Sequence, residues 1–179
     1  MVLIIGAHIF CGSVGDSRAV LSRNGQAVNL SLDHKASRPD EVARIQKNDG
    51  IIEFARVGGK LAITRAFGDF EFKYVRDTQG RRQRKDMITS EPEIRRYDYN
   101  PTEDEFIILG SDGLFDMFKS QEAVEFVREK LLKQQFMSQS VDRIAKAIAF
   151  ESIYVKNVRD NTTVLIIALN RGVMSPPTK

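Results

Sequence analysis

The sequence predicts an α+β protein with antiparallel sheets. Short apolar runs separated by turn residues fill the first thirty positions, as is typical of an antiparallel meander. Two consecutive helical patterns come later, and a β-branched strand follows them. Strands and helices therefore occupy separate blocks, which favours an α+β fold over alternating βαβ units. The length of 179 residues is enough for one domain with a sizeable core.

Four strands are expected before residue 31. Asn24-Gly25 is the clearest turn signal among them, because this pair favours the type I′ turn of a two-residue hairpin. Gly15-Asp16-Ser17 predicts another tight turn. The four strands are Val2–Ile5, His8–Val14, Arg18–Ser22 and Gln26–Leu30.

A short helix and a second hairpin are expected next. Pro39 suits the first turn of a helix that ends at Gly50, and Ser37 with Asp40 resembles a capping box. The hairpin pattern that follows is typical of two strands joined by a glycine turn. It consists of Ile51–Val57, the turn Gly58-Gly59, and Lys60–Phe67.

The middle of the chain is expected to be irregular. Residues 70–87 are interpreted as a loop that carries a basic cluster. A solvated loop is favoured over a nuclear-localisation or nucleic-acid site, because a short cluster without interleaved aromatic residues is weak evidence. Pro92 restricts residues 88–99 to an edge strand at best. The basic cluster comprises Arg81, Arg82, Arg84 and Lys85.

The C-terminal part combines a buried strand, two helices and a final strand. The unbroken apolar run at residues 106–109 suits a strand covered on both faces. Ser120 is expected to cap a helix over Gln121–Lys133. Ser138 or Ser140 is expected to cap a second helix, and the final strand is expected at Thr162–Leu169.

Three aspartates share one local context. Asp16, Asp112 and Asp160 each lie at a strand end, beside a small or amide residue. If the strands are neighbours, the carboxylates converge, and converging anions repel unless a cation offsets their charge. Oxygen ligands without nearby His or Cys favour Mg²⁺ or Mn²⁺ over Zn²⁺. The alternative is that Asp112-Gly113 is only a turn, since Asp-Gly is a common turn pair.

Composition argues against several classes of protein. The apolar runs are too short to span a membrane, and Met1–Ile5 lacks the basic n-region and long h-region of a secretory signal. Cys11 is the single cysteine, which excludes an internal disulfide and suits a reducing compartment such as the cytoplasm or nucleus. The net charge of +3 is too small to predict a nucleic-acid partner. His8 and His34 are isolated and are interpreted as structural histidines.

Six segments resemble, in order, the motifs of the metal-dependent protein serine/threonine phosphatases, the PPM or type-2C family. They are GDSRAVLSRNGQAV, LDHKASRPDEVARIQKNDG, RVGGKLAITRAFGDFEFK, SEPEI, EDEFIILGSDGLFDMFKSQEAVEFVRE and RDNTTVLII. Each motif is modest by itself, but six in the family order are specific. They disfavour the interpretation of Asp112 as a turn residue only.

The resemblance implies a β-sandwich flanked by helices, with a binuclear Mg²⁺ or Mn²⁺ centre at one edge. In the family, a metal-bridging water hydrolyses phosphoserine and phosphothreonine on proteins, because the metals lower the pKa of bound water. By resemblance, Asp112 and Asp160 are the catalytic pair and ligate one metal. Asp16 and Asp116 resemble residues that help to hold a weaker third metal. Residues 35–57 resemble the flap beside the cleft, which influences substrate choice.

The resemblance also implies missing parts. The family's DGHGG motif, an upstream acidic ligand and a phosphate-binding arginine have no counterpart here. Residues 1–170 are therefore expected to be an incomplete phosphatase domain, and 171–179 a flexible tail. The chain is expected to be weakly active or inactive alone, with phosphoproteins as partners and neither a membrane nor nucleic acid. The alternative is a non-catalytic, phosphatase-like binding module.

Overall fold

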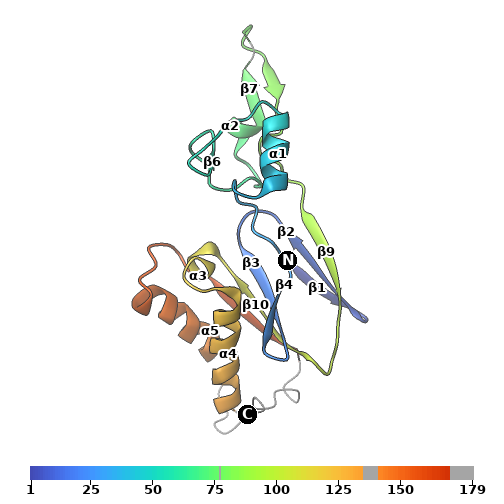
Figure 1. Cartoon of the computed structure of the whole chain (residues 1–179), viewed down its shortest axis with the longest axis vertical. Coiled ribbons are helices and arrows are strands. Elements are labelled where there is room, and N and C mark those ends of the chain that lie inside the picture. The colour runs from blue at the N-terminus through green and yellow to red at the C-terminus, as the bar shows by residue number, and fades with distance from the viewer. Residues whose placement is uncertain (77, 135–140, 170–179) are drawn as a thin grey trace. The chain divides into compact units, whose positions relative to one another are not determined.

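The computed structural model describes residues 1–76, 78–134 and 141–169 (Figure 1). The chain divides into two compact units, which are described separately. The first unit contains residues 1–12 and 17–32 and the chain from Ile94 onward. The second unit contains residues 13–16 and 33–93. The expected caps at Ser138 or Ser140 and the expected tail at 171–179 lie outside the described residues.

A four-stranded antiparallel sheet forms the centre of the first unit, in the order β11-β10-β3-β4. Asn24 and Gly25 join β3 to β4 with φ angles of 50° and 77°, which confirms the predicted hairpin turn. β10 lies between two neighbours and is buried along most of its length, as its apolar run predicts. The strands are β3 (Arg18–Arg23), β4 (Gln26–Asn29), β10 (Asp104–Gly110) and β11 (Val164–Ala168).

A three-stranded sheet in the order β1-β2-β9 packs against this sheet. Ile9 and Cys11 of β2 are buried in one cluster with Leu21 and Ile107 of the larger sheet. This apolar layer between two sheets makes the first unit a β-sandwich. β9 lies at an edge, as Pro92 predicts. The strands are β1 (Val2–Ile5), β2 (His8–Ser13) and β9 (Glu93–Asp98).

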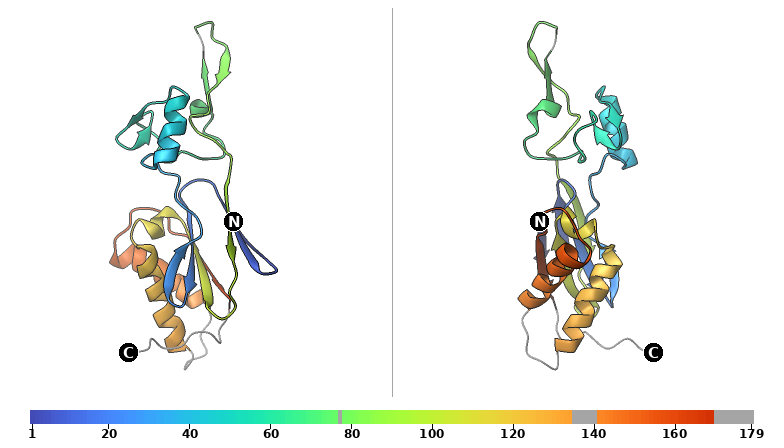
Figure 2. Two further views of the ribbon diagram at one scale, coloured as in Figure 1. Left: turned by 45° about the vertical axis from the view of Figure 1, so that its right-hand side comes forward. Right: turned by 90° about the vertical axis from the view of Figure 1, so that its left-hand side faces the viewer.

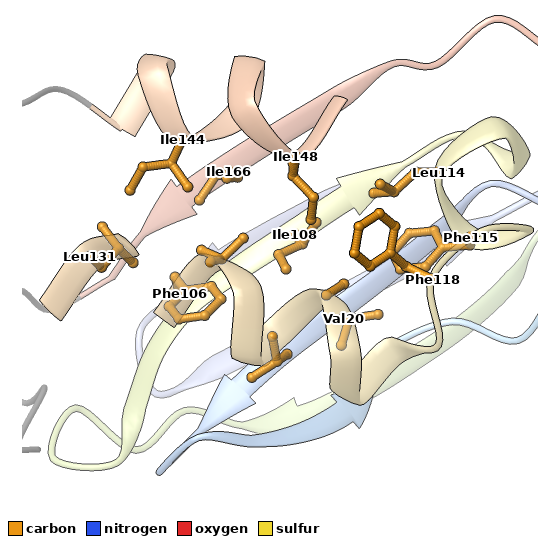
Figure 3. Close-up of a cluster of buried hydrophobic side chains, with 13 residues drawn as sticks. Val20, Phe106, Ile108, Leu114, Phe115, Phe118, Leu131, Ile144, Ile148 and Ile166 are labelled. Atoms are coloured by element: carbon orange, nitrogen blue, oxygen red, sulfur yellow. The ribbon is translucent and has the colours of Figure 1, made fainter. Parts of the chain in front are cut away.

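Helices cover the other face of the four-stranded sheet (Figure 2). Phe106 and Ile108 of β10 pack there with Val124, Ile144 and Ile148 of the helices (Figure 3). A π-helical turn continues the last α-helix, and no sequence pattern predicted it. The elements are α3 (Asp112–Phe115), α4 (Ser120–Gln134), α5 (Val141–Phe150) and η1 (Glu151–Val155). The antiparallel α+β fold with a helix-covered sandwich is thus confirmed. Within the described residues, no helix combines the length and the apolar character needed to cross a bilayer.

The second unit is built around the helix α1. Its core contains Ile45, Val57, Phe72 and Ile88, all less than a tenth exposed. Its elements are α1 (Pro39–Lys47), β5 (Ile52–Glu53), β6 (Arg56–Val57), α2 (Phe70–Lys73), β7 (Tyr74–Arg76) and β8 (Arg82–Arg84).

The predicted cap of α1 is wrong. Arg38, not Ser37, is the N-cap residue, and no side chain makes a capping hydrogen bond. Pro39 at the first helical position excludes helical φ and ψ for the residue before it, so Arg38 is extended at φ −77° and ψ 123°. The Arg38 guanidinium instead pairs with Asp40 at 2.7 Å.

Two further predictions in the second unit are wrong. The β5–β6 hairpin turns at Phe54-Ala55, with φ angles of 52° and 56°, and not at Gly58-Gly59. The glycines form the next turn, where the Leu61 N–H bonds to Val57 O at 3.2 Å, and residues 60–67 form no regular strand. Residues 70–87 are not a plain loop, because buried Phe72 anchors α2 and β7 pairs with β8.

Candidate metal centre

The ends of β10 and β11 bring two distant parts of the sequence together. Gly110 pairs with Val164, and the Ser111 N–H donates to Thr163 O at 3.1 Å. The Ser111 hydroxyl donates to Asn161 O and accepts from the Thr163 N–H, both at 3.1 Å. Ser111 precedes Asp112 and Asn161 follows Asp160, so the two predicted ligands stand on neighbouring backbone segments.

The two segments approach so closely at Gly113 that a side chain does not fit. A Cβ atom at this position would lie 2.5 Å from Asn161 O and 2.9 Å from Thr162 Oγ1. The buried Ser152 hydroxyl of η1 donates to Gly113 O at 2.8 Å from a third segment. Asp112 therefore lies between two residues that are fixed by contacts distant in sequence.

The two carboxylates have similar local hydrogen bonds but different exposure. Asp112 is the first residue of α3 and is half-buried, and its Oδ1 accepts the Gly113 N–H at 2.8 Å. Asp160 is exposed, and its Oδ1 accepts the Asn161 N–H at 2.7 Å. In each case the following amide orients the carboxylate at the strand end.

Asp116 lies one helical turn after Asp112. Its N–H donates to Asp112 O at 2.7 Å, and its backbone is helical at φ −73° and ψ −26°. Residues four apart in a helix share a face, so the two carboxylates project from the same side of α3. Asp116 is exposed to solvent.

Asp16 belongs to the second unit. It follows Gly15, whose φ of +98° suits glycine, and its Oδ2 lies 3.4 Å from Lys35 Nζ. Asp112 and Asp160 belong to the first unit, so the convergence of Asp16 with them stays a prediction.

The carboxylates of the first unit suit a hard cation with an incomplete protein ligand set. Mg²⁺ commonly keeps several waters and binds through one or two carboxylates. Within residues 1–76, 78–134 and 141–169, no three His, Cys, Asp or Glu side chains form a group that could hold a metal ion. In the same described part, the buried Thr162 Oγ1 beside Gly113 has no hydrogen-bond partner. The oxygen chemistry of these carboxylates suits Mg²⁺ or Mn²⁺.

Sequence reasoning missed three residues that support this site. Ser111 and Ser152 donate hydrogen bonds to backbone carbonyls of other elements, and the hydroxyl of Thr162 lies beside Gly113. The SDG and DN motifs contain or adjoin Ser111 and Thr162, which is the only sequence signal that could have indicated them. Ser152 has no such signal, because its contact depends on the π-helical turn.

Comparison with known proteins identifies the family. A family model described as protein phosphatase 2C matches residues 1–162. The chain belongs to the protein phosphatase 2C family. It is 39% identical over 165 residues to protein phosphatase 2C homolog 2 of Schizosaccharomyces pombe, covering 92% of this chain and 44% of that protein. It is 40% identical over 179 residues to the probable protein phosphatase 2C T23F11.1 of Caenorhabditis elegans, covering 99% and 49%.

Solved structures of similar fold agree with this assignment. A phosphatase from Toxoplasma gondii is similar with a TM-score of 0.73 and 26% identity, covering 92% of this chain and 48% of that one. A Caenorhabditis elegans sex-determining protein shares the fold with a TM-score of 0.75, at 22% identity, covering 95% and 40%. This protein phosphatase 2C chain spans about half the length of the curated relatives it matches.

Proposed function

We propose that this chain supplies Asp112 and Asp160 as metal ligands for the hydrolysis of phosphoserine and phosphothreonine on proteins. One observation carries the proposal: Ser111 and Gly113 both contact Asn161, so the two aspartates stand on adjoining segments. Membership of the protein phosphatase 2C family supports the reaction class. The proposed substrates are phosphoproteins.

The proposed cofactors are two Mg²⁺ or Mn²⁺ ions, with a weaker third. When bound, such ions lower the pKa of water and stabilise charge on the entering and leaving oxygens. Asp112 and Asp160 hold one ion, and their fixed backbone reduces the cost of orienting them. Asp16 and Asp116 help to hold the third ion. The proposed location is the cytoplasm or nucleus, with a role in signalling.

The 179-residue chain by itself is expected to turn over p-nitrophenyl phosphate negligibly with Mn²⁺. The reason is that the family's DGHGG motif, its upstream acidic ligand and its phosphate-binding arginine have no counterpart in this sequence. A colorimetric assay of the purified chain tests this expectation. Robust hydrolysis that Asp112→Asn abolishes would contradict it and show that the chain is sufficient for catalysis.

A non-catalytic binding module is the second candidate function. The lack of a counterpart to the family's DGHGG motif motivates it, whereas the retained Asp112 and Asp160 argue against it. A calorimetric titration discriminates the two: absence of heat with Mn²⁺, together with retention of a phosphoprotein in a pull-down, favours the binding module.

Nucleic-acid binding through the basic cluster has less support. Arg84 pairs with Asp86 and Lys85 pairs with Asp49, each at 2.8 Å, so carboxylates offset part of its charge. If nucleic-acid binding measured in a filter-binding assay does not depend steeply on salt concentration, this candidate function is wrong.

A further inference from the structure

His34 is a fully buried histidine in the second unit, and two of its nitrogen atoms contact the same backbone carbonyl oxygen. Its backbone N–H and its ring Nδ1 each lie 2.9 Å from Gly15 O. A carbonyl oxygen can only accept hydrogen bonds, so Nδ1 carries the hydrogen. The peptide that leads into Asp16 is therefore bound twice by one residue.

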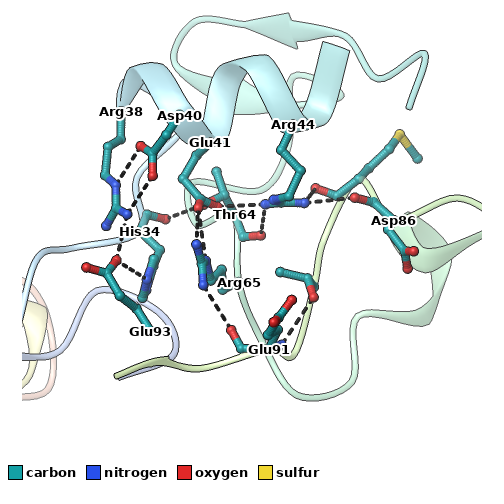
Figure 4. Close-up of polar contacts among 12 residues, drawn as sticks. His34, Arg38, Asp40, Glu41, Arg44, Thr64, Arg65, Asp86, Glu91 and Glu93 are labelled. Carbon is teal, nitrogen blue, oxygen red and sulfur yellow. Dashed lines mark hydrogen bonds and ion pairs between the residues drawn. The ribbon is translucent and has the colours of Figure 1, made fainter. Parts of the chain in front are cut away.

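The far side of the ring is also enclosed by protein. Nε2 lies 3.2 Å from Glu93 Oε2, and the same oxygen accepts a hydrogen bond from Arg38 Nη2 at 2.6 Å (Figure 4). Both ring nitrogens thus face protein partners and no part of His34 is exposed to solvent. This geometry excludes His34 as a metal ligand or as an acid that reaches a substrate.

The contact to Gly15 does not require a charged ring. Burial lowers the pKa of His34, and the nearby Arg65 and Arg38 lower it further, while the bond to Gly15 and the charge of Glu41 raise it. The pKa stays below its ordinary value, so the ring is neutral at neutral pH. The neutral form keeps its hydrogen on Nδ1, directed at Gly15, so its Nε2 has no hydrogen to donate to Glu93.

The backbone around His34 is held in turn by the second unit. His34 O accepts the Thr64 N–H at 2.8 Å, and Lys35 forms a bridge with Ile63. Lys35 also places its ammonium group 3.4 Å from Asp16 Oδ2. His34 and Lys35 thus fix the carbonyl before Asp16 and one of its carboxylate oxygens.

We propose that His34 is a positioning residue that fixes the Gly15–Asp16 turn and so pre-orients the Asp16 carboxylate for a divalent cation. The role of Asp16 in cation binding rests on the proposed function. The contact of His34 with the turn does not depend on that function. In this role His34 acts through the backbone of Gly15 and contacts neither metal nor substrate.

Hydrogen–deuterium exchange of the metal-free chain tests the holding of the turn. His34→Leu removes the donor at similar size, and His34→Asn places an amide donor near the position of Nδ1. The expected result is exchange of residues 13–17 about fivefold faster in the Leu variant, the size of one lost hydrogen bond, with partial rescue by Asn. His8→Leu, at the other histidine, is the matched control and leaves this segment unchanged. Unchanged exchange in His34→Leu, or an equal increase across the whole second unit, overturns the proposal.

Mn²⁺ binding, followed by electron paramagnetic resonance, tests the consequence for the cation. His34→Leu is expected to weaken binding as much as Asp16→Asn does. If Asp16→Asn weakens binding and His34→Leu does not, the positioning role is wrong. If Asp16→Asn has no effect, the proposed metal role of Asp16 fails, and the exchange result alone decides whether His34 holds the turn.

Discussion

Gly113 shows how little space separates the two aspartate-bearing segments. Its Cα lies so close to Asn161 that even a methyl group would approach backbone oxygen at 2.5 Å. Real Cβ atoms do not tolerate that distance, so the backbone would have to move. The presence of glycine beside Asp112 is therefore a packing requirement, and not only a turn preference.

Gly113→Ala is expected to destabilise the chain by about 1–3 kcal/mol, the typical cost of overpacking. Urea denaturation measures the change. Gly12→Ala is the matched control, because a Cβ atom there meets nothing within 4 Å. Equal stability of the two variants would show that the β10 and β11 ends are not in close contact.

At the scale of single residues, sequence predicted the aspartates but not their supports. Asp112 and Asp160 could be proposed because the motif resemblance and the strand-end pattern coincide at them. Ser152 could not, because only the three-dimensional fold places its hydroxyl beside Gly113. His34 was correctly expected to be structural, but its partner Gly15 lies 19 positions away.

At the scale of elements, the buried carboxylate of Glu41 links α1 to Thr64 and Arg65 (Figure 4). Glu41 accepts hydrogen bonds from Arg65, Thr64 and Arg44, each as short as 2.6 Å. Burial by itself raises the pKa of Glu41, but these three donors outweigh it and lower the pKa to about 2. The folded unit therefore favours the charged form.

Glu41→Gln is expected to lower the free energy of unfolding at pH 7 by roughly 2–3 kcal/mol. Because the pKa of Glu41 is lower in the folded chain, its charged form stabilises the fold at pH values above 4.5, its pKa in the unfolded chain. This contribution is lost as the pH falls toward about 2. Urea denaturation at pH 7 and pH 3 should show a smaller difference between wild type and variant at the lower pH. Glu53→Gln, at an exposed carboxylate, is the control. A difference that is independent of pH would contradict this account.

The hairpins show where element prediction succeeds and where it fails. Asn24-Gly25 was predicted correctly, because both residues tolerate positive φ. Phe54-Ala55 could not be predicted, since neither residue favours the left-handed region and two glycines stand nearby. Packing of Ile52 and Val57 on the core of the second unit selects that register over the one the glycines suggest.

At the scale of the whole molecule, one face of the sandwich keeps apolar side chains in solvent. Leu3 and Ile5 of β1 and Ile94 of β9 are 45%, 61% and 68% exposed. Such an uncovered apolar surface beside an edge strand favours association with other chains.

Replacing Leu3 and Ile5 together by lysine is expected to reduce aggregation and binding of an apolar dye, with little loss of stability. Light scattering and dye fluorescence measure the first two, and urea denaturation the third. Ile9→Lys is the contrasting variant, because Ile9 is fully buried between the sheets and its replacement should unfold the chain. Unchanged scattering in the double variant would show that this face does not drive association.

The affinity of the 179-residue chain for Mn²⁺ is the measurement that most directly tests whether Asp112 and Asp160 share a cation. Paramagnetic resonance titrations should show that Asp112→Asn and Asp160→Asn each weaken binding by about tenfold or more, the effect of losing roughly 1.4 kcal/mol. Asp142→Asn, which removes an exposed carboxylate paired with Lys146, should leave the affinity unchanged. Equal affinity in all four proteins would contradict the assignment of a shared cation to the ends of β10 and β11.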